Sequence, residues 1–192
     1  MRGALLVLGV LLAVQGCATS SQTEAAPPSE SPAAVDLRMD ACPAADGPAG
    51  DGDVLPELSF PCLAGSGDLT LGTAPGVPTV LNLWAPWCEP CRDELPLFDQ
   101  LHTEAGEVVG VLGLVEKDTL ASSLSYVSDA GLTFPSALDE TGELLEDQGI
   151  NGLPVTFFLR ADGSIAHREI GPIHSYEELR GLVAQHLGVT VP

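Results

Sequence analysis

A run of apolar residues that leads directly into two closely spaced cysteines constrains this chain more than any other feature. Val80 to Trp84 has the composition of a strand buried on both faces. Cys88 and Cys91 follow at the start of a segment with helical periodicity, Glu89 to Ala105. The pattern predicts a strand that delivers a C-x-x-C pair to the N-terminus of a helix.

This position gives the two cysteines different chemistry. A sulfur at a helix start faces unpaired backbone N–H groups and the positive end of the helix dipole, and both favour the thiolate. We therefore expect Cys88 to be the attacking sulfur. Cys91 lies one turn inside the helix, where it is shielded and close enough to resolve a mixed disulfide.

Two other interpretations of the pair are a structural disulfide and half of a zinc site. A zinc site needs two further Cys or His ligands at comparable spacing. The chain has no second C-x-x-C, and its histidines show no paired ligand spacing: His102, His167, His174 and His186. Redox activity is therefore the favoured interpretation, and it requires no metal or organic cofactor.

The N-terminus has the pattern of an export signal. Arg2 is followed by an apolar run from Ala4 to Val14 that is too short to span a bilayer. Residues 1–16 are therefore predicted to be a signal peptide. Cys17 follows in a context that resembles the lipobox of bacterial lipoproteins, so we expect it to carry lipid; the alternative is an ordinary signal with an incidental cysteine. The predicted location is extracytoplasmic, on a membrane.

Residues 17–52 are predicted to be the lipidated cysteine and a flexible linker, and residues 53–192 one folded domain. Residues 18–36 are mostly Ser, Thr, Ala, Pro and Glu, which cannot bury enough surface to fold. The remaining length suits one well-buried domain and not two. The formal net charge of -20 excludes nucleic acid as a partner.

The domain alternates short apolar runs with longer amphipathic segments, which predicts an α/β fold with a largely parallel sheet. Further strands are expected at Val108–Val115, Phe134–Leu138, Val155–Leu159 and Ile165–Gly171, and further helices at Leu120–Ala130, Leu144–Gln148 and from a Ser175 cap through Leu187. The charged pair Glu116 and Lys117 is interpreted as solvated surface.

Cys42 and Cys62 form the remaining cysteine pair once Cys17 is assigned to lipid. An oxidising compartment favours disulfides, and a bond closing this Gly/Pro-rich loop stabilises by about 3 kcal/mol in the chain-entropy model. We expect a structural disulfide because neither cysteine lies at a recognisable helix start. A second redox centre is the alternative.

The segment WAPWCEPC, which ends at Cys91, resembles the active site of the thioredoxin superfamily. Gly152 to Thr156 (GLPVT) resembles the cis-proline loop of that family. The resemblance implies a thioredoxin-like fold, in which a central mixed sheet is flanked by helices. It also implies that Trp87, Leu153 and Pro154 contact the bound substrate peptide.

The longer run from Cys88 to Pro96 (CEPCRDELP) resembles the exported, membrane-tethered branch that includes ResA, TlpA and the cytochrome c maturation thioredoxins. The resemblance covers roughly residues 54–187 and implies an N-terminal extension. The spacing between Cys91 and Pro154 exceeds that of a minimal thioredoxin. An inserted strand-helix element is therefore expected in the Leu120–Leu138 region.

Two polar residues acquire roles from this resemblance. Asn82 occupies the strand position where thioredoxin has a buried acid that assists proton transfer. Glu94 matches an active-site glutamate of the ResA-like branch and is expected to manage the thiol protons instead. The alternative for Glu94 is a solvated acid on the helix face.

The predicted function is exchange of disulfides with exported, cysteine-containing proteins. The resemblance favours a reductant, for example in cytochrome c maturation, resupplied by a membrane or thioredoxin-like redox partner. A disulfide-donating oxidant is the alternative. A peroxiredoxin-like peroxidase needs a P-x-x-x-T-x-x-C run that is absent, and a copper chaperone of the Sco type needs C-x-x-x-C.

Overall fold

A five-stranded mixed sheet with the order β5-β4-β3-β6-β7 organises the computed structural model. The structure describes residues 37–44 and 47–192, so the predicted signal peptide, Cys17 and most of the linker lie outside the described residues. In chain order the elements are β1 (Ser59–Pro61), β2 (Asp68–Thr70), β3 (Thr79–Trp84), α1 (Glu89–Ala105), β4 (Gly110–Glu116), α2 (Leu120–Ala130), β5 (Ser136–Asp139), α3 (Glu143–Asp147), β6 (Val155–Leu159), β7 (Ile165–Ile170) and α4 (Tyr176–Leu187).

The strand that precedes the cysteines is the centre of the sheet. β3 pairs in parallel with β4, and β4 pairs in parallel with β5. On its other side β3 pairs antiparallel with β6, which pairs antiparallel with β7. All six residues of β3 are buried, as expected for an apolar strand covered on both faces. The α/β class and the mixed sheet implied by the resemblance are confirmed, whereas the largely parallel sheet expected from the apolar pattern is not, because β6 and β7 pair antiparallel.

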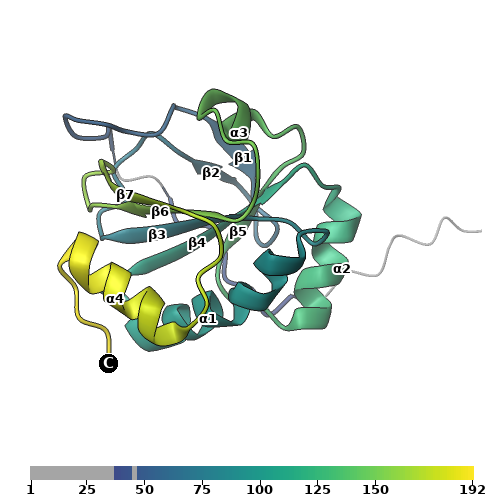
Figure 1. Ribbon diagram of the computed structural model, residues 1–192. Coiled ribbons are helices and arrows are strands. Elements are labelled where there is room, and N and C mark those ends of the chain that lie inside the picture. The colour runs from purple at the N-terminus through teal and green to yellow at the C-terminus, as the bar shows by residue number, and fades with distance from the viewer. Residues whose placement is uncertain (1–36, 45–46) are drawn as a thin grey trace, which may run out of the picture. The chain divides into compact units, whose positions relative to one another are not determined.

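Helices cover one face of the sheet, and a mixed layer covers the other. Figure 1 shows α1 and α4 together below the sheet, with α3 and the β1–β2 hairpin above it. Phe98 of α1 and Val183 of α4 belong to one buried cluster. Phe60 of β1 and Leu144 of α3 belong to a second one. The sheet is therefore sandwiched between two apolar cores.

Three helices have the limits and caps that their local sequences predict. α1 spans the predicted residues, with Cys88 as its N-cap. α2 ends at Gly131, whose φ of 67° is the left-handed conformation that glycine adopts readily. The Ser175 side chain accepts a hydrogen bond from the Glu178 N–H and caps α4. None of the helices in the described part of the chain is long and apolar enough to span a bilayer.

Several boundaries differ from those predicted. β4 begins at Gly110 and continues to Glu116, one residue beyond the predicted end. β5 begins after Pro135 rather than at Phe134. The β1–β2 hairpin was not predicted, because each of its strands has only three residues and one buried side chain.

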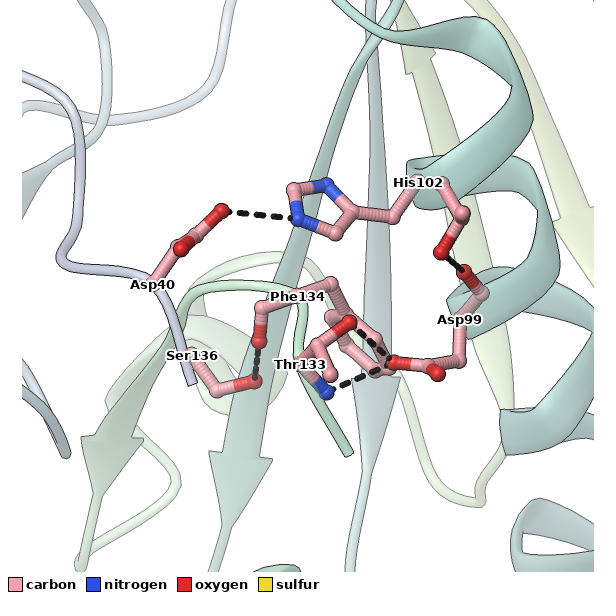
Figure 2. Close-up of polar contacts among 7 residues, drawn as sticks. Asp40, Asp99, His102, Thr133, Phe134 and Ser136 are labelled. Carbon is pink, nitrogen blue, oxygen red and sulfur yellow. Dashed lines mark hydrogen bonds and ion pairs between the residues drawn. The ribbon is translucent and has the colours of Figure 1, made fainter. Parts of the chain in front are cut away.

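The chain also folds earlier than the boundary expected at Asp53. Met39 is only 6% exposed, and the Asp40 N–H donates to the Thr133 carbonyl at 2.8 Å. Figure 2 shows the Asp40 carboxylate directed at the His102 ring, with 3.0 Å between the oxygen and Nε2, while Asp99 of α1 accepts from Thr133. These contacts are long-range, so the composition of the segment does not reveal them.

Candidate active site

β3 and α1 together place Cys88 at the carboxyl edge of the sheet. The Cys88 backbone is extended, with φ -85° and ψ 102°, and its sulfur accepts a hydrogen bond from the Cys91 N–H at 3.3 Å. Cys88 and Cys91 form a disulfide with a Cα–Cα distance of 5.3 Å. The same backbone N–H that contacts the sulfur here can stabilise a Cys88 thiolate after reduction.

The two cysteines of the pair differ in their solvent exposure. Cys88 is 5% exposed, whereas Cys91 is fully buried. The neighbouring Trp87 is 59% exposed, and its indole Nε1–H donates to the Lys117 carbonyl at 3.2 Å. Of the two cysteines, only Cys88 therefore keeps a small exposed area, next to the exposed Trp87 indole.

Glu94 lies beneath the cysteine pair on the inner face of α1. It is 1% exposed, so a solvated helix-face acid does not describe it. Its Oε1 accepts from Asn82 Nδ2 at 2.8 Å, and its Oε2 accepts from the Ile173 N–H at 2.9 Å. Burial raises the pKa of Glu94 from 4.5 to about 7, although these two hydrogen bonds lower it. A carboxyl with this pKa can both take and give a proton near neutral pH.

Asn82 joins Glu94 to the strand that follows the proline loop. Its Nδ2 also donates to Thr156 Oγ1 of β6 at 3.1 Å. Its Oδ1 is buried without a hydrogen-bond partner. A protonated Glu94 carries an O–H donor, and rotation of the Asn82 amide would give that donor an acceptor.

Pro154 lies at the edge of the sheet that carries the cysteines. The Leu153–Pro154 peptide bond is cis. Val155, the next residue, pairs with Leu83 of β3, one residue before Trp84. Leu153 packs against the buried cluster that contains Cys88 and Cys91. The loop predicted to contact a substrate peptide therefore adjoins the cysteine pair.

Cys42 and Cys62 form a second disulfide, with a Cα–Cα distance of 6.1 Å. Both pack against the apolar cluster on the α3 side of the sheet, not the one that contains Cys88. Cys62 bridges Ala137 of β5. The bond thus joins the N-terminal segment to the sheet, away from the C-x-x-C pair.

Glu116, at the carboxyl edge of the sheet, was interpreted from the sequence as solvated surface, and the structure contradicts this interpretation. It is fully buried rather than solvated, because β4 continues through it and both faces of the sheet are covered. Burial and then the charge of Asp139 raise the pKa of Glu116 to about 9, with Lys117 opposing them. The unbroken run from Val111 to Glu116 is the signal that could have placed this carboxyl inside.

The described part of the chain offers little for a metal. Its His, Cys, Asp and Glu side chains nowhere gather in threes with the geometry to hold an ion. Cys88 and Cys91 are bonded to each other and not held apart as ligands.

Comparison with known proteins places this site in context. The model of the AhpC/TSA family matches residues 52–168. A thiol:disulfide interchange protein DsbE of Allochromatium vinosum is 32% identical over 158 residues, which cover 80% of this chain and 83% of that protein. The thiol-disulfide oxidoreductase ResA of Bacillus thuringiensis (strain Al Hakam) is 31% identical over 102 residues, 53% of this chain and 58% of ResA. The chain thus spans less than two thirds of that ResA.

A solved structure agrees with these relatives. A secreted Mycobacterium tuberculosis disulfide oxidoreductase, described as homologous to E. coli DsbE, is 27% identical with a TM-score of 0.58, covering 67% of this chain and 96% of that one. The similarity confirms the predicted thioredoxin-like fold.

Proposed function

The chain belongs to the AhpC/TSA family, and we propose that within it this protein is an exported thiol-disulfide oxidoreductase that acts through Cys88 and Cys91. The observation that carries the proposal is the cysteine pair itself. Cys88 caps α1, and its sulfur accepts a hydrogen bond from the Cys91 N–H, while Cys91 itself is fully buried. The relatives named as oxidoreductases and interchange proteins support the same activity.

The reaction begins with the reduced pair. The Cys88 thiolate attacks one sulfur of a partner disulfide, forming a mixed disulfide and releasing the other partner sulfur as a thiolate. Cys91 then loses its proton and attacks the Cys88 sulfur, which releases the second partner thiol. Two electrons pass to the partner, and the protein is left with the Cys88–Cys91 disulfide. The reverse sequence oxidises a dithiol.

Glu94 is proposed to move the proton in the resolving step. It lies three residues after Cys91 on α1, so the two side chains share a helix face. Its pKa of about 7 leaves both protonation states populated near neutrality. As an acceptor it deprotonates Cys91, and the Asn82 amide accommodates either state by rotation.

Trp87, Leu153 and Pro154 are proposed to bind the partner peptide around Cys88. The exposed indole offers an apolar surface that the Lys117 carbonyl keeps in place. The cis-proline loop offers backbone groups at the same edge of the sheet. The partner is a cysteine-containing exported protein, and a membrane or thioredoxin-like donor restores the reduced pair.

We propose that the protein works outside the cytoplasm, tethered to a membrane. In this proposal residues 1–16 are removed, Cys17 carries the lipid and residues 18–36 form the tether. The Cys42–Cys62 disulfide is structural and fixes the folded domain to that tether. In this proposal the protein reduces the disulfides of its partners, as in the maturation of c-type cytochromes.

The decisive experiment combines the trapping of partner proteins on Cys88 with a measurement of the reduction potential. In the tether-free domain, Cys91→Ser should accumulate a partner disulfide on Cys88, whereas Cys88→Ser should trap nothing. The reduction potential of the Cys88–Cys91 pair should lie near or below about -270 mV for a reductant, whereas about -120 mV would identify an oxidant. Adding Cys42→Ser and Cys62→Ser to the Cys91→Ser domain should leave this trapping unchanged. Partners recovered on Cys88→Ser would reject the assignment.

The same preparations test the remaining functions. Consumption of hydrogen peroxide that depends on Cys88 would favour a peroxidase. Tight, stoichiometric Cu(I) binding without disulfide exchange would favour a copper chaperone. We expect neither result.

A further inference from the structure

The carboxyl edge of the sheet contains a second buried acid, in addition to Glu94, that the exchange reaction does not use. Glu116 is the last residue of β4, and it pairs in register with Asp139, the last residue of β5. β3 runs parallel to β4, so the chain leaves β3 for Cys88 at this same edge. Glu116 therefore lies on the side of the molecule where the cysteine pair is presented.

The two paired acids differ in their hydrogen bonds. Asp139 Oδ1 accepts from the Gly142 N–H at 2.8 Å, and Oδ2 accepts from the Leu144 N–H at 3.0 Å. Its charge is thus satisfied by the start of α3. Neither buried oxygen of Glu116 meets a partner at full hydrogen-bond geometry, and the one side chain close enough to share a proton with it is Asp139, which favours the neutral form of Glu116. A bare buried carboxylate beside Asp139 is strongly disfavoured, so Glu116 is the protonated member of the pair.

Among the described residues, the charged groups that act on Glu116 are Asp139 of β5 and Lys117, the residue directly after β4. Burial and Asp139 raise the pKa of Glu116 to about 9, and Lys117 lowers it. The neutral acid is therefore the form present at physiological pH.

The residue after Glu116 connects this pair to the active site. Lys117 has a left-handed backbone with φ 52°, which is uncommon for a residue other than glycine. Its N–H donates to the Asp139 carbonyl at 2.8 Å. Its own carbonyl accepts from the indole Nε1–H of Trp87 at 3.2 Å. The carbonyl group that anchors Trp87 therefore belongs to the residue directly after the buried acid.

We propose that Glu116, in its neutral form, is a positioning residue that holds the Lys117 carbonyl where it anchors Trp87 beside Cys88. Ionisation of Glu116 forces the carboxylate toward water, moves the end of β4 and releases the indole. The inference rests on the proposed function only in that Trp87 then contacts the partner protein.

The test follows the two indole N–H signals of the oxidised, ¹⁵N-labelled domain by NMR from pH 6 to 10.5. In this form Cys88 and Cys91 do not titrate, and Trp87→Phe identifies the Trp87 signal. We expect that signal in the wild type to shift with a midpoint near pH 9. Glu116→Gln, a neutral isostere, should keep the low-pH position throughout. Glu143→Gln, which removes an exposed carboxyl at the same edge, should titrate like the wild type.

The consequence for exchange is measured with the reduced domain. At pH 10 about nine-tenths of Glu116 side chains are ionised, so the anchored population should fall about tenfold. Relative to Glu116→Gln, wild-type reduction of a protein disulfide should then slow, whereas reduction of a small aromatic disulfide should not. Equal rates of protein reduction for the two forms would contradict the proposal.

Other outcomes are equally informative. The proposal is overturned if the wild-type Trp87 signal does not shift with pH. It is also overturned if Glu116→Gln shows the same pH transition as the wild type. Because the titration requires no disulfide exchange, it tests the role of Glu116 independently of the proposed function. Normal exchange without a Trp87 transition rejects this inference alone. A Trp87 transition in a domain that exchanges no disulfide rejects the proposed function alone.

Discussion

Replacement of Glu94 by glutamine should change how the stability of the domain depends on pH. The folded state raises the pKa of Glu94 from 4.5 to about 7, so between these values the folded protein binds more protons than the unfolded chain. The free energy of unfolding therefore falls as pH rises through this window and is constant above it. At about 1.4 kcal/mol per pH unit, the loss from this one carboxyl is about 3 kcal/mol.

Glutamine removes the titration but keeps the shape of the side chain. Its amide oxygen can accept from the Ile173 N–H, and its amide nitrogen can donate to Asn82 Oδ1, which now lacks a partner. We expect the Glu94→Gln domain to be about 3 kcal/mol more stable, relative to wild type, at pH 8 than at pH 4.5. Urea unfolding of the oxidised domains at several pH values measures this difference.

The comparison needs a control for the loss of one negative charge. Asp93→Asn removes an exposed carboxylate from the same turn of α1 and serves that purpose. A stability difference between wild type and Glu94→Gln that stays constant, within about 0.5 kcal/mol, from pH 4.5 to 8 would refute the reasoning. It would mean that Glu94 is hydrated or that its ionised form is fully compensated.

Three further variants test the packing, the second disulfide and a helix cap of the domain. In Gly113→Ala the added Cβ would lie 2.8 Å from Trp84 Nε1, so we expect about 1–3 kcal/mol of destabilisation and a changed near-ultraviolet spectrum of the indole. Replacing Cys42 and Cys62 together by alanine should lower the free energy of unfolding by about 3 kcal/mol in urea, while the potential of the active-site pair stays unchanged. Ser175→Ala should remove the α4 cap and about 1 kcal/mol, measured by thermal unfolding.

Local signals account for the parts of the fold that were predicted well. α1 has its predicted limits because an apolar strand, the cysteine at the cap and the helical spacing of Leu95 and Phe98 all lie within one short segment. Gly131 likewise ends α2 by its own conformational freedom. Such features depend on neighbours in the chain and need no tertiary contact.

The missed features depend on contacts between distant residues. Met39 is buried in the segment whose Asp40 N–H donates to the Thr133 carbonyl, more than ninety positions further along the chain. Asp99 of α1 in turn accepts from the Thr133 N–H. Glu116 is buried because β5 and the α3 layer cover the end of its strand. For Glu94 the sequence indicated the residue, whereas its hydrogen bond from Ile173 required the folded chain.

That hydrogen bond gives the domain a means of adjustment that leaves its cysteines untouched. The Ile173 N–H belongs to the short connection between β7 and α4, near the C-terminal end of the chain, yet it stabilises the ionised form of Glu94. Gly171 in the same connection donates its N–H to the Pro154 carbonyl. Sequence changes in these few residues can therefore shift the pKa of Glu94 and move the cis-proline loop, while C-E-P-C is retained.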